Sequence, residues 1–156
     1  MKKILFVCHG NICRSPMAEF ILKDMVAKKG MESDFFIASS ATSTEEIWNG
    51  VGNPVYPPAK RELALHGISC EGKRAVQLQR SDYEKYDLLI GMDNANLRNM
   101  HRILGGDPDG KVYRLMDYTP RGGEVADPWY SDRFDIAYRD ISEGCAALLE
   151  HLLQQS

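Results

Sequence analysis

The chain lacks any long hydrophobic run. The apolar stretch nearest its N-terminus, residues 4–7, stops at Cys8, well short of the roughly 7–15 apolar residues of a signal-peptide core. No segment approaches the ~20 consecutive apolar residues of a membrane span. We therefore expect no membrane partner, and the cytoplasm is the expected location.

An excess of basic residues is also missing. The chain carries 19 Lys and Arg against 22 Asp and Glu, for a formal net charge of −3. A sequence-independent nucleic-acid binder normally presents a basic face, so no nucleic-acid partner is expected. The charge does not exclude local binding of an oxyanion, because one arginine and a ring of backbone N–H groups suffice for that.

The cysteine spacings typical of metal sites are absent. The chain has four cysteines, Cys8, Cys13, Cys70 and Cys145, but no C-x-x-C pair, and His9 has no matching second cluster. We therefore expect no metal and no cofactor. Two disulfides remain an alternative, although that pattern is typical of small secreted domains. Cys70 and Cys145 are predicted to be core residues.

What the chain does contain is an alternation of strand and helix patterns. With 156 residues and 44% hydrophobic content, residues 1–156 are expected to form a single domain with its own core. Strands are predicted at 2–7, 34–39, 86–90 and 111–115, helices at 16–28, 58–66, 94–104 and 131–153, and irregular loops at 42–58 and 120–127. This order predicts an α/β fold, an open, mostly four-stranded parallel sheet with helices on both faces.

The segment Cys8–Ser15 (CHGNICRS) joins the first predicted strand to the first predicted helix, where α/β folds bind ligands. Gly10 and Asn11 tolerate positive φ and so allow the loop to turn its N–H groups inward. A cysteine reacts as its thiolate, which a helix N-terminus, these N–H groups and a nearby cation stabilise. Arg14 can also hold two phosphate oxygens at once. The ATP-binding pattern G-x-x-x-x-G-K-[ST] is absent, so this cysteine-led turn predicts covalent attack on phosphorus.

A candidate acid lies in the second irregular loop. Asp127, followed by Pro128, can protonate a leaving group from a position over the turn. The alternative is that Asp127 is only a turn residue before a helix. Its neighbours Trp129 and Tyr130 can form a wall for an aromatic ring, or else pack partly into the core.

Cys13 is the second cysteine of the turn and has two interpretations. It can be a small buried hydrophobic residue. It can instead be a resolving thiol that forms a disulfide with Cys8 under oxidation and so protects Cys8 from over-oxidation. The proximity of the two cysteines favours the redox role, and Ser15 is expected to be the N-cap of the following helix.

Together, these residues resemble the low-molecular-weight protein tyrosine phosphatases. Val7–Pro16 (VCHGNICRSP) is similar to the phosphate loop of that family. Further similar stretches follow in order at 39–42, 65–68, 91–93, 96–98 and 127–130, so the resemblance spans nearly the whole chain.

The resemblance implies roles for the residues of the turn. Cys8 would be the nucleophile, Arg14 the phosphate clamp and Asp127 the general acid and then the base. The remaining phosphate-binding loop would be His9, Gly10, Asn11, Ile12, Cys13 and Ser15, with Ser15 hydrogen-bonded to the thiolate. The implied activity is metal-independent hydrolysis of phosphotyrosine and aryl phosphates through a phosphocysteine intermediate. The partners would be tyrosine-phosphorylated proteins or small aryl phosphates, with phosphate or another oxyanion held in the loop.

The same resemblance implies supporting and pocket residues outside the turn. Asn11 would hold the strained shape of the loop with the help of Ser39 and His66, and Asp93 would support Arg14 or the loop. The slot for the substrate ring would be lined by Trp48, Trp129 and Tyr130.

Two positions bear on the substrate. Relatives that resemble phosphoarginine phosphatases typically carry Thr at the position of Ile12, so the apolar Ile12 indicates the phosphotyrosine type. His9 occupies a variable position at the pocket mouth and can alter preference.

Two other functions use related features. An arsenate reductase shares this fold and loop but needs a relay of two further cysteines, and Cys70 has no near partner in the sequence. A non-catalytic phosphate-binding module would need neither the thiol nor the acid, so Cys8, Arg14 and Asp127 favour an enzyme.

Overall fold

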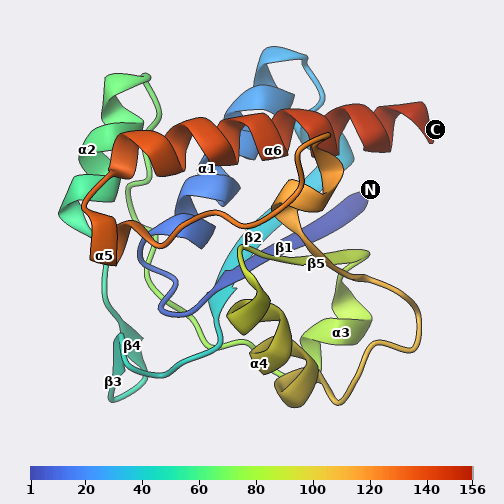
Figure 1. Ribbon diagram of the computed structural model, residues 1–156, viewed down its shortest axis with the longest axis horizontal. Helices are drawn as coiled ribbons and strands as arrows, with labels where there is room; N and C mark the ends of the chain where they lie inside the picture. Colours follow the sequence, from blue (N-terminus) through green and yellow to red (C-terminus); the bar gives the residue numbers. More distant parts are fainter. Residues whose placement is uncertain (156) are drawn as a thin grey trace.

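The computed structural model describes residues 1–155, and its centre is a sheet of four parallel strands (Figure 1). The spatial order is β2-β1-β5-β6, formed by β1 (Lys2–Cys8), β2 (Phe35–Ala41), β5 (Leu88–Gly91) and β6 (Val112–Arg114). The α/β fold with an open parallel sheet, predicted from the order of elements, is confirmed.

Helices cover both faces of this sheet. The α-helices are α1 (Arg14–Lys28), α2 (Pro57–Leu65), α3 (Asp82–Lys85), α4 (Asn94–Leu104), α5 (Pro128–Ser131) and α6 (Phe134–Gln154), with short 3₁₀ helices η1 (Glu32–Asp34) and η2 (Leu115–Tyr118). Figure 1 shows α1 and α6 on one side of the strands and α3 and α4 on the other. α1 joins the parallel strands β1 and β2 and packs against both, as the helix of a βαβ crossover does.

The central strand β1 carries side chains into two separate cores. Ile4 and Phe6 belong to the larger core on the α1 and α6 side. Leu5 and Val7 belong to the smaller core on the α3 and α4 side. A parallel strand that is buried on both faces has a continuous apolar sequence, as β1 does. Its burial holds β1 in place, and Cys8 ends the strand at the carboxyl edge of the sheet.

Two helices differ from the sequence prediction. The first helix begins at Arg14 rather than at residue 16, and its N-cap is Cys13, so the assignment of Ser15 as the N-cap was wrong. The last predicted helix, 131–153, is interrupted, because Asp132 adopts a left-handed φ of 61° between α5 and α6. The result is a short helix, α5, directly beside Asp127.

Two small elements were missed. The loop at 42–58 contains a hairpin, β3 (Ile47–Trp48) and β4 (Val51–Gly52), whose turn places Asn49 and Gly50 at positive φ. The four-residue helix α3 was also not predicted, since a single turn carries no helical periodicity.

All four cysteines are free and buried, so the alternative of two disulfides was wrong. The pKa values of Cys70 and Cys145 are both raised, chiefly by burial. Both residues lie in the larger core, as predicted. Among residues 1–155, no helix has the length and apolar character needed to cross a bilayer.

Candidate active site

The turn between β1 and α1 forms the floor of a cavity of about 380 Å³. The cavity is lined by Cys8, His9, Gly10, Ile12, Cys13, Arg14, Glu45, Glu46, Asp127, Trp129 and Tyr130. The structure therefore brings together the cysteine, the arginine and the acid that the sequence singled out, although about 110 residues separate the turn from the acid.

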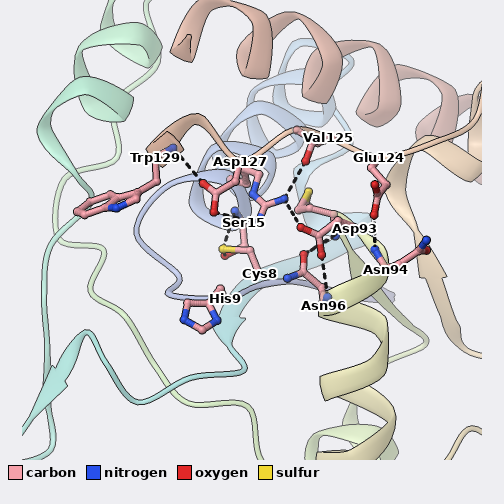
Figure 2. Close-up of polar contacts among 12 residues, drawn as sticks. Cys8, His9, Ser15, Asp93, Asn94, Asn96, Glu124, Val125, Asp127 and Trp129 are labelled. Carbon is pink, nitrogen blue, oxygen red and sulfur yellow. Dashed lines mark hydrogen bonds and ion pairs between the residues drawn. The ribbon is translucent and has the colours of Figure 1, made fainter. Parts of the chain in front are cut away.

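The Cys8 thiol is bound by Ser15 through two contacts. The Ser15 Oγ lies 3.0 Å from Cys8 Sγ, and the Ser15 backbone N–H donates to the same sulfur at 3.4 Å. Figure 2 shows Ser15 directly beside the sulfur. Hydrogen bonds directed at a sulfur stabilise its anionic form, so the first turn of α1 is arranged to hold a thiolate.

Asn11 holds the shape of the loop from inside. It is buried and adopts a left-handed φ of 59°, a conformation that Asn accepts more readily than most residues. Its Oδ1 accepts a hydrogen bond from the Val76 N–H at 3.0 Å. Its Nδ2 donates to Ser15 Oγ at 2.8 Å and to Ser39 Oγ at 2.9 Å. Because Ser15 Oγ accepts from Asn11, its own hydrogen is free to donate to Cys8 Sγ.

A buried carboxylate lies behind this network. Ser39 Oγ donates to Glu19 Oε1 at 2.6 Å. Lys23 Nζ pairs with Glu19 Oε2, and Lys73 Nζ lies 3.7 Å from Glu19 Oε1 and donates to the Ser39 carbonyl at 2.9 Å. Burial lowers the pKa of Lys73, and the Glu19 charge partly offsets this. Glu19 and Lys73 were not predicted from the sequence. Both contact Ser39, which in turn binds Asn11, so they support the loop from behind.

Arg14 is buried and one end of its guanidinium group is anchored. Its NH1 donates to Asp93 Oδ2 at 2.7 Å and to the Val125 carbonyl at 2.8 Å, as drawn in Figure 2. Burial opposes the charge of Arg14, but the negative groups Cys8, Asp93 and Asp127 outweigh it and raise its pKa. With NH1 committed, the remaining N–H groups can serve an oxyanion.

Asp93 also fixes the position of α4. Its Oδ1 accepts from the Asn96 N–H at 2.7 Å and the Asn96 side chain returns a contact to the Asp93 N–H, which forms a capping box. The same carboxylate therefore caps a helix and anchors Arg14.

Asp127 lies at the edge of the cavity and has two contacts. Its Oδ1 accepts from the Trp129 N–H at 3.0 Å as the N-cap of α5. Its Oδ2 lies 3.7 Å from Arg14 NH2. In Figure 2 the carboxylate lies on the same side of the loop as the Cys8 thiol. Asp127 can therefore cap the helix and line the cavity at the same time, because the cap uses Oδ1 and leaves Oδ2 near Arg14.

Aromatic rings form one wall of the cavity. Trp129 packs against Tyr56, with ring centroids 4.8 Å apart, and the backbone N–H of Tyr56 donates to the carbonyl of Ile12 at 2.9 Å. Tyr130 is 86% exposed, so it stands at the mouth. The wall suits a flat ring attached to a phosphate bound below.

Trp48 does not occupy the place predicted for it. It lies on the β3–β4 hairpin, its side chain is 80% exposed, and it is not among the residues that line the cavity. The hairpin extends the loop so that the tryptophan projects beyond the mouth. Glu45 and Glu46, three and two residues before Trp48, line the cavity instead.

His66 does not support the loop either. Its Nε2 pairs with Glu62 Oε2 at 3.0 Å and its ring stacks on Tyr138 at 3.7 Å between centroids. The stacking on Tyr138 links the end of α2 to α6. The group that reaches the Ser39 strand is Lys73, seven residues further on, so the prediction for Ser39 agrees with the contacts and that for His66 was wrong.

Cys13 lies on the cavity wall as a free, buried thiol. Burial raises its pKa to about 12, and the negative charge of Cys8 adds to this effect. Cys13 therefore rests as a neutral thiol beside Cys8. Among residues 1–155, no group of three or more His, Cys, Asp or Glu side chains is placed to hold a metal ion.

Comparison with known proteins gives this geometry a family. The family model described as "Low molecular weight phosphotyrosine protein phosphatase" matches residues 3–156. This chain belongs to that family. The match begins within β1 and includes both the cysteine-led loop and the Asp127 segment, so all parts of the cavity fall inside it.

Individual members of the family are similar over nearly their full length. The low molecular weight protein-tyrosine-phosphatase YfkJ of Bacillus subtilis is 35% identical, with 99% of this chain and 98% of YfkJ covered. The low molecular weight phosphotyrosine protein phosphatase of Rattus norvegicus is 34% identical, with 96% and 94% covered.

Solved structures agree with the fold. The crystal structure of YfkJ superimposes with a TM-score of 0.93 at 34% identity, covering 100% of this chain and 97% of that one. The structure of Vibrio vulnificus Wzb in complex with benzylphosphonate gives a TM-score of 0.82 at 25% identity, covering 96% and 98%. Vibrio vulnificus Wzb thus binds benzylphosphonate on this fold.

Proposed function

We propose that this chain is a metal-independent protein tyrosine phosphatase, a single domain spanning residues 1–156 that forms a phosphocysteine intermediate on Cys8. The observation that carries the proposal is the placement of three groups around one cavity: the Ser15-bound Cys8 thiol, the anchored Arg14 guanidinium and the Asp127 carboxylate. Family membership and the relatives' activity support the substrate class.

In the first step the Cys8 thiolate attacks phosphorus and a sulfur–phosphorus bond forms. The bond from phosphorus to the phenolic oxygen breaks, and that oxygen takes a proton from Asp127. The loop N–H groups and the free N–H groups of Arg14 stabilise the charge on the three equatorial oxygens. No positive charge beyond Arg14 is needed, which is why the proposal does not include a metal.

In the second step water attacks the phosphocysteine. Asp127, now a carboxylate, takes a proton from the water as its oxygen bonds to phosphorus. The sulfur–phosphorus bond breaks, phosphate leaves and Cys8 returns as a thiolate. The Ser15 hydrogen bond stabilises this leaving group as it stabilised the nucleophile.

The ring slot supports phosphotyrosine as the substrate group. Ile12 is buried and presents an apolar side chain to the cavity, and Trp129 and Tyr130 flank the opening. An aromatic ring gains contact area there, whereas the cationic guanidine of a phosphoarginine would lose hydration against Ile12. Tyrosine-phosphorylated proteins and small aryl phosphates, found in the cytoplasm, are the proposed substrates.

Hydrolysis of p-nitrophenyl phosphate in EDTA, with the variants Cys8→Ser and Asp127→Ala, tests this function. We expect Cys8→Ser to abolish turnover. Asp127→Ala should lower kcat/KM, which reports the attack step, by about 10²–10⁴-fold for a phosphotyrosyl peptide, which has a poor leaving group, and by much less for p-nitrophenyl phosphate. Turnover by Cys8→Ser, or equal slowing of both substrates, would contradict the assigned roles.

We also propose that Cys13 resolves oxidised Cys8 as a disulfide. Support comes from the location of both thiols on one cavity wall and from the neutral state of Cys13 at rest. Conversion of Cys8 to the uncharged sulfenic acid removes one of the charges that keep the pKa of Cys13 high. Peptide mapping after peroxide treatment should recover a Cys8–Cys13 peptide pair, and Cys13→Ser should instead accumulate the sulfinic acid at Cys8.

A further inference from the structure

The mouth of the cavity carries negative charge. Glu45 and Glu46 follow β2 and both line the opening, together with His9, Trp129 and Tyr130. Of the described residues that line the cavity, none is a lysine, and the permanent cation is Arg14 at the floor. We call Glu45 and Glu46 the acidic rim.

The acidic rim is held against the phosphate loop. A Cβ placed on Gly10 would lie 3.2 Å from Glu46 Cγ, so the Glu46 side chain lies directly on the loop. Glu46 Oε1 accepts from Asn53 Nδ2 at 3.1 Å, and its carbonyl accepts from the Asn53 N–H at 2.8 Å. Glu45 Oε2 lies 3.1 Å from His9 Nε2. The two carboxylates therefore belong to the cavity.

Such a rim opposes binding of a bare phosphate group. An aryl phosphate carries negative charge, and two carboxylates at the entrance repel it over distances comparable with the Debye length. The negative charge of the acidic rim also acts at the floor of the cavity. Burial is the main reason for the raised pKa of Cys13, and the Glu46 charge adds a smaller increase. The loop alone would bind phosphate better without these two glutamates.

A positive charge on the substrate, next to its phosphate, reverses this effect. The ring of a phosphotyrosine held at the aromatic wall leaves the flanking residues of the polypeptide at the mouth, within reach of Glu45, whose side chain is 68% exposed. Lysine or arginine there gains attraction, while aspartate or glutamate adds repulsion. Opposed charges of this kind set specificity by rejecting the wrong partner as much as by binding the right one.

We propose that Glu45 and Glu46 make this enzyme select phosphotyrosyl polypeptides that carry lysine or arginine beside the phosphotyrosine. The inference rests on the proposed phosphatase function and names the substrate class for the same cavity.

Two phosphotyrosyl peptides of equal length test the rim, one with arginine and one with glutamate on both sides of the phosphotyrosine. For the natural chain we expect kcat/KM to be about tenfold higher for the arginine peptide at low salt, and the ratio to shrink at 0.5 M NaCl. In the double variant Glu45→Gln, Glu46→Gln the ratio should fall to about one or two, mainly because the glutamate peptide improves.

The matched control is the double variant Glu32→Gln, Glu84→Gln, which removes the same charge from two exposed glutamates on η1 and α3. It should keep the tenfold ratio. Equal kcat/KM for the two peptides, or an unchanged ratio in the rim variant, would overturn the selection by the rim. Turnover of p-nitrophenyl phosphate, measured in the same preparations, separates this result from failure of the phosphatase function, which would abolish activity on all three substrates.

Discussion

Three hydrogen-bonded side chains, Ser39, Asn11 and Ser15, lie between the buried Glu19 and the Cys8 sulfur. Glu19 accepts from Ser39, Asn11 donates to both Ser39 and Ser15, and Ser15 contacts the sulfur. Each side chain in this series is oriented by its hydrogen bonds to the neighbouring members. The strained loop around Asn11 therefore depends on groups that never touch the substrate.

Ser39→Ala should lower both stability and activity. The substitution leaves an Asn11 N–H and a Glu19 oxygen without their partner inside the protein, which costs about 1–3 kcal/mol. We expect a lower melting temperature and a kcat/KM for p-nitrophenyl phosphate reduced about tenfold, as the Ser15 hydroxyl loses its fixed orientation. Thermal denaturation and steady-state kinetics measure the two effects.

The neighbouring Ser40 supplies the control. It is equally buried, but its Oγ is among the buried polar atoms that have no hydrogen-bond partner within the described part of the chain. Ser40→Ala removes an unsatisfied hydroxyl and should be neutral or slightly stabilising. Full activity in Ser39→Ala, or equal losses in both variants, would contradict the positioning role of Ser39.

Cys13 should resist alkylation in the folded protein. Its pKa of about 12 leaves about one thiolate in ten thousand at pH 8, against about one in four for an ordinary thiol. Mass spectrometry of iodoacetamide-treated protein should find Cys13 unmodified under native conditions and modified in urea. Labelling of native Cys13 at the rate seen in urea would contradict its buried, neutral state.

The residues of the turn could be predicted because they are contiguous, whereas their supports could not. Cys8, Arg14 and Ser15 lie within one loop, so their chemistry follows from their spacing. Asp93 was implied by resemblance, and its capping motif gave it a local signal. Glu19 on α1 and Lys73 in the segment after α2 meet at Ser39 of β2, a tertiary contact that a local sequence pattern does not reveal.

At the scale of elements, the β3–β4 hairpin and α5 make opposite contributions to the cavity. The hairpin directs Trp48 into solvent, while α5 places Trp129 against Tyr56 at the opening. Trp129→Ala should raise KM for p-nitrophenyl phosphate several-fold, because part of the wall for the ring is lost. Trp48→Ala should change KM by less than about twofold.

Steady-state kinetics on the two tryptophan variants measure this difference directly, and each serves as the control for the other. A large rise in KM for Trp48→Ala would show that the hairpin folds over the substrate. Equal values for the two variants would contradict the assignment of the wall to α5.

Element boundaries were predictable where capping residues are visible in the sequence. α4 spans Asn94–Leu104 as predicted, since Asp93 caps its start and Gly105 ends it with a left-handed φ of 80°. The break between α5 and α6 depends on a left-handed Asp132, a conformation that Asp accepts but that residue type alone does not predict. The start of α1 was misplaced because the side chain of Ser15 binds the thiol instead of capping the helix.

For the whole molecule, the cavity couples anion binding to global stability. An anion that binds only the folded state stabilises it by RT ln(1 + [L]/Kd), which is about 1.4 kcal/mol at ten times Kd. For a chain of this size the melting temperature should rise by roughly 3–5 °C in phosphate relative to chloride of equal ionic strength. Differential scanning fluorimetry measures the shift.

Arg14→Lys supplies the control for this shift. The variant retains a positive charge near Asp93 and Asp127 but loses the planar fork that holds two oxygens. The phosphate-dependent rise should fall by half or more. A rise of the same size in Arg14→Lys would place the anion elsewhere on the molecule.

The most direct test of the account is detection of phosphate on Cys8. Asp127→Ala should accumulate the intermediate with p-nitrophenyl phosphate, because attack on a good leaving group proceeds while the base for hydrolysis is missing. Rapid acid quenching followed by peptide mass spectrometry should find one phosphoryl group on the peptide that contains Cys8. Burst release of p-nitrophenol with phosphate on another residue, or with none on the protein, would contradict the phosphocysteine mechanism.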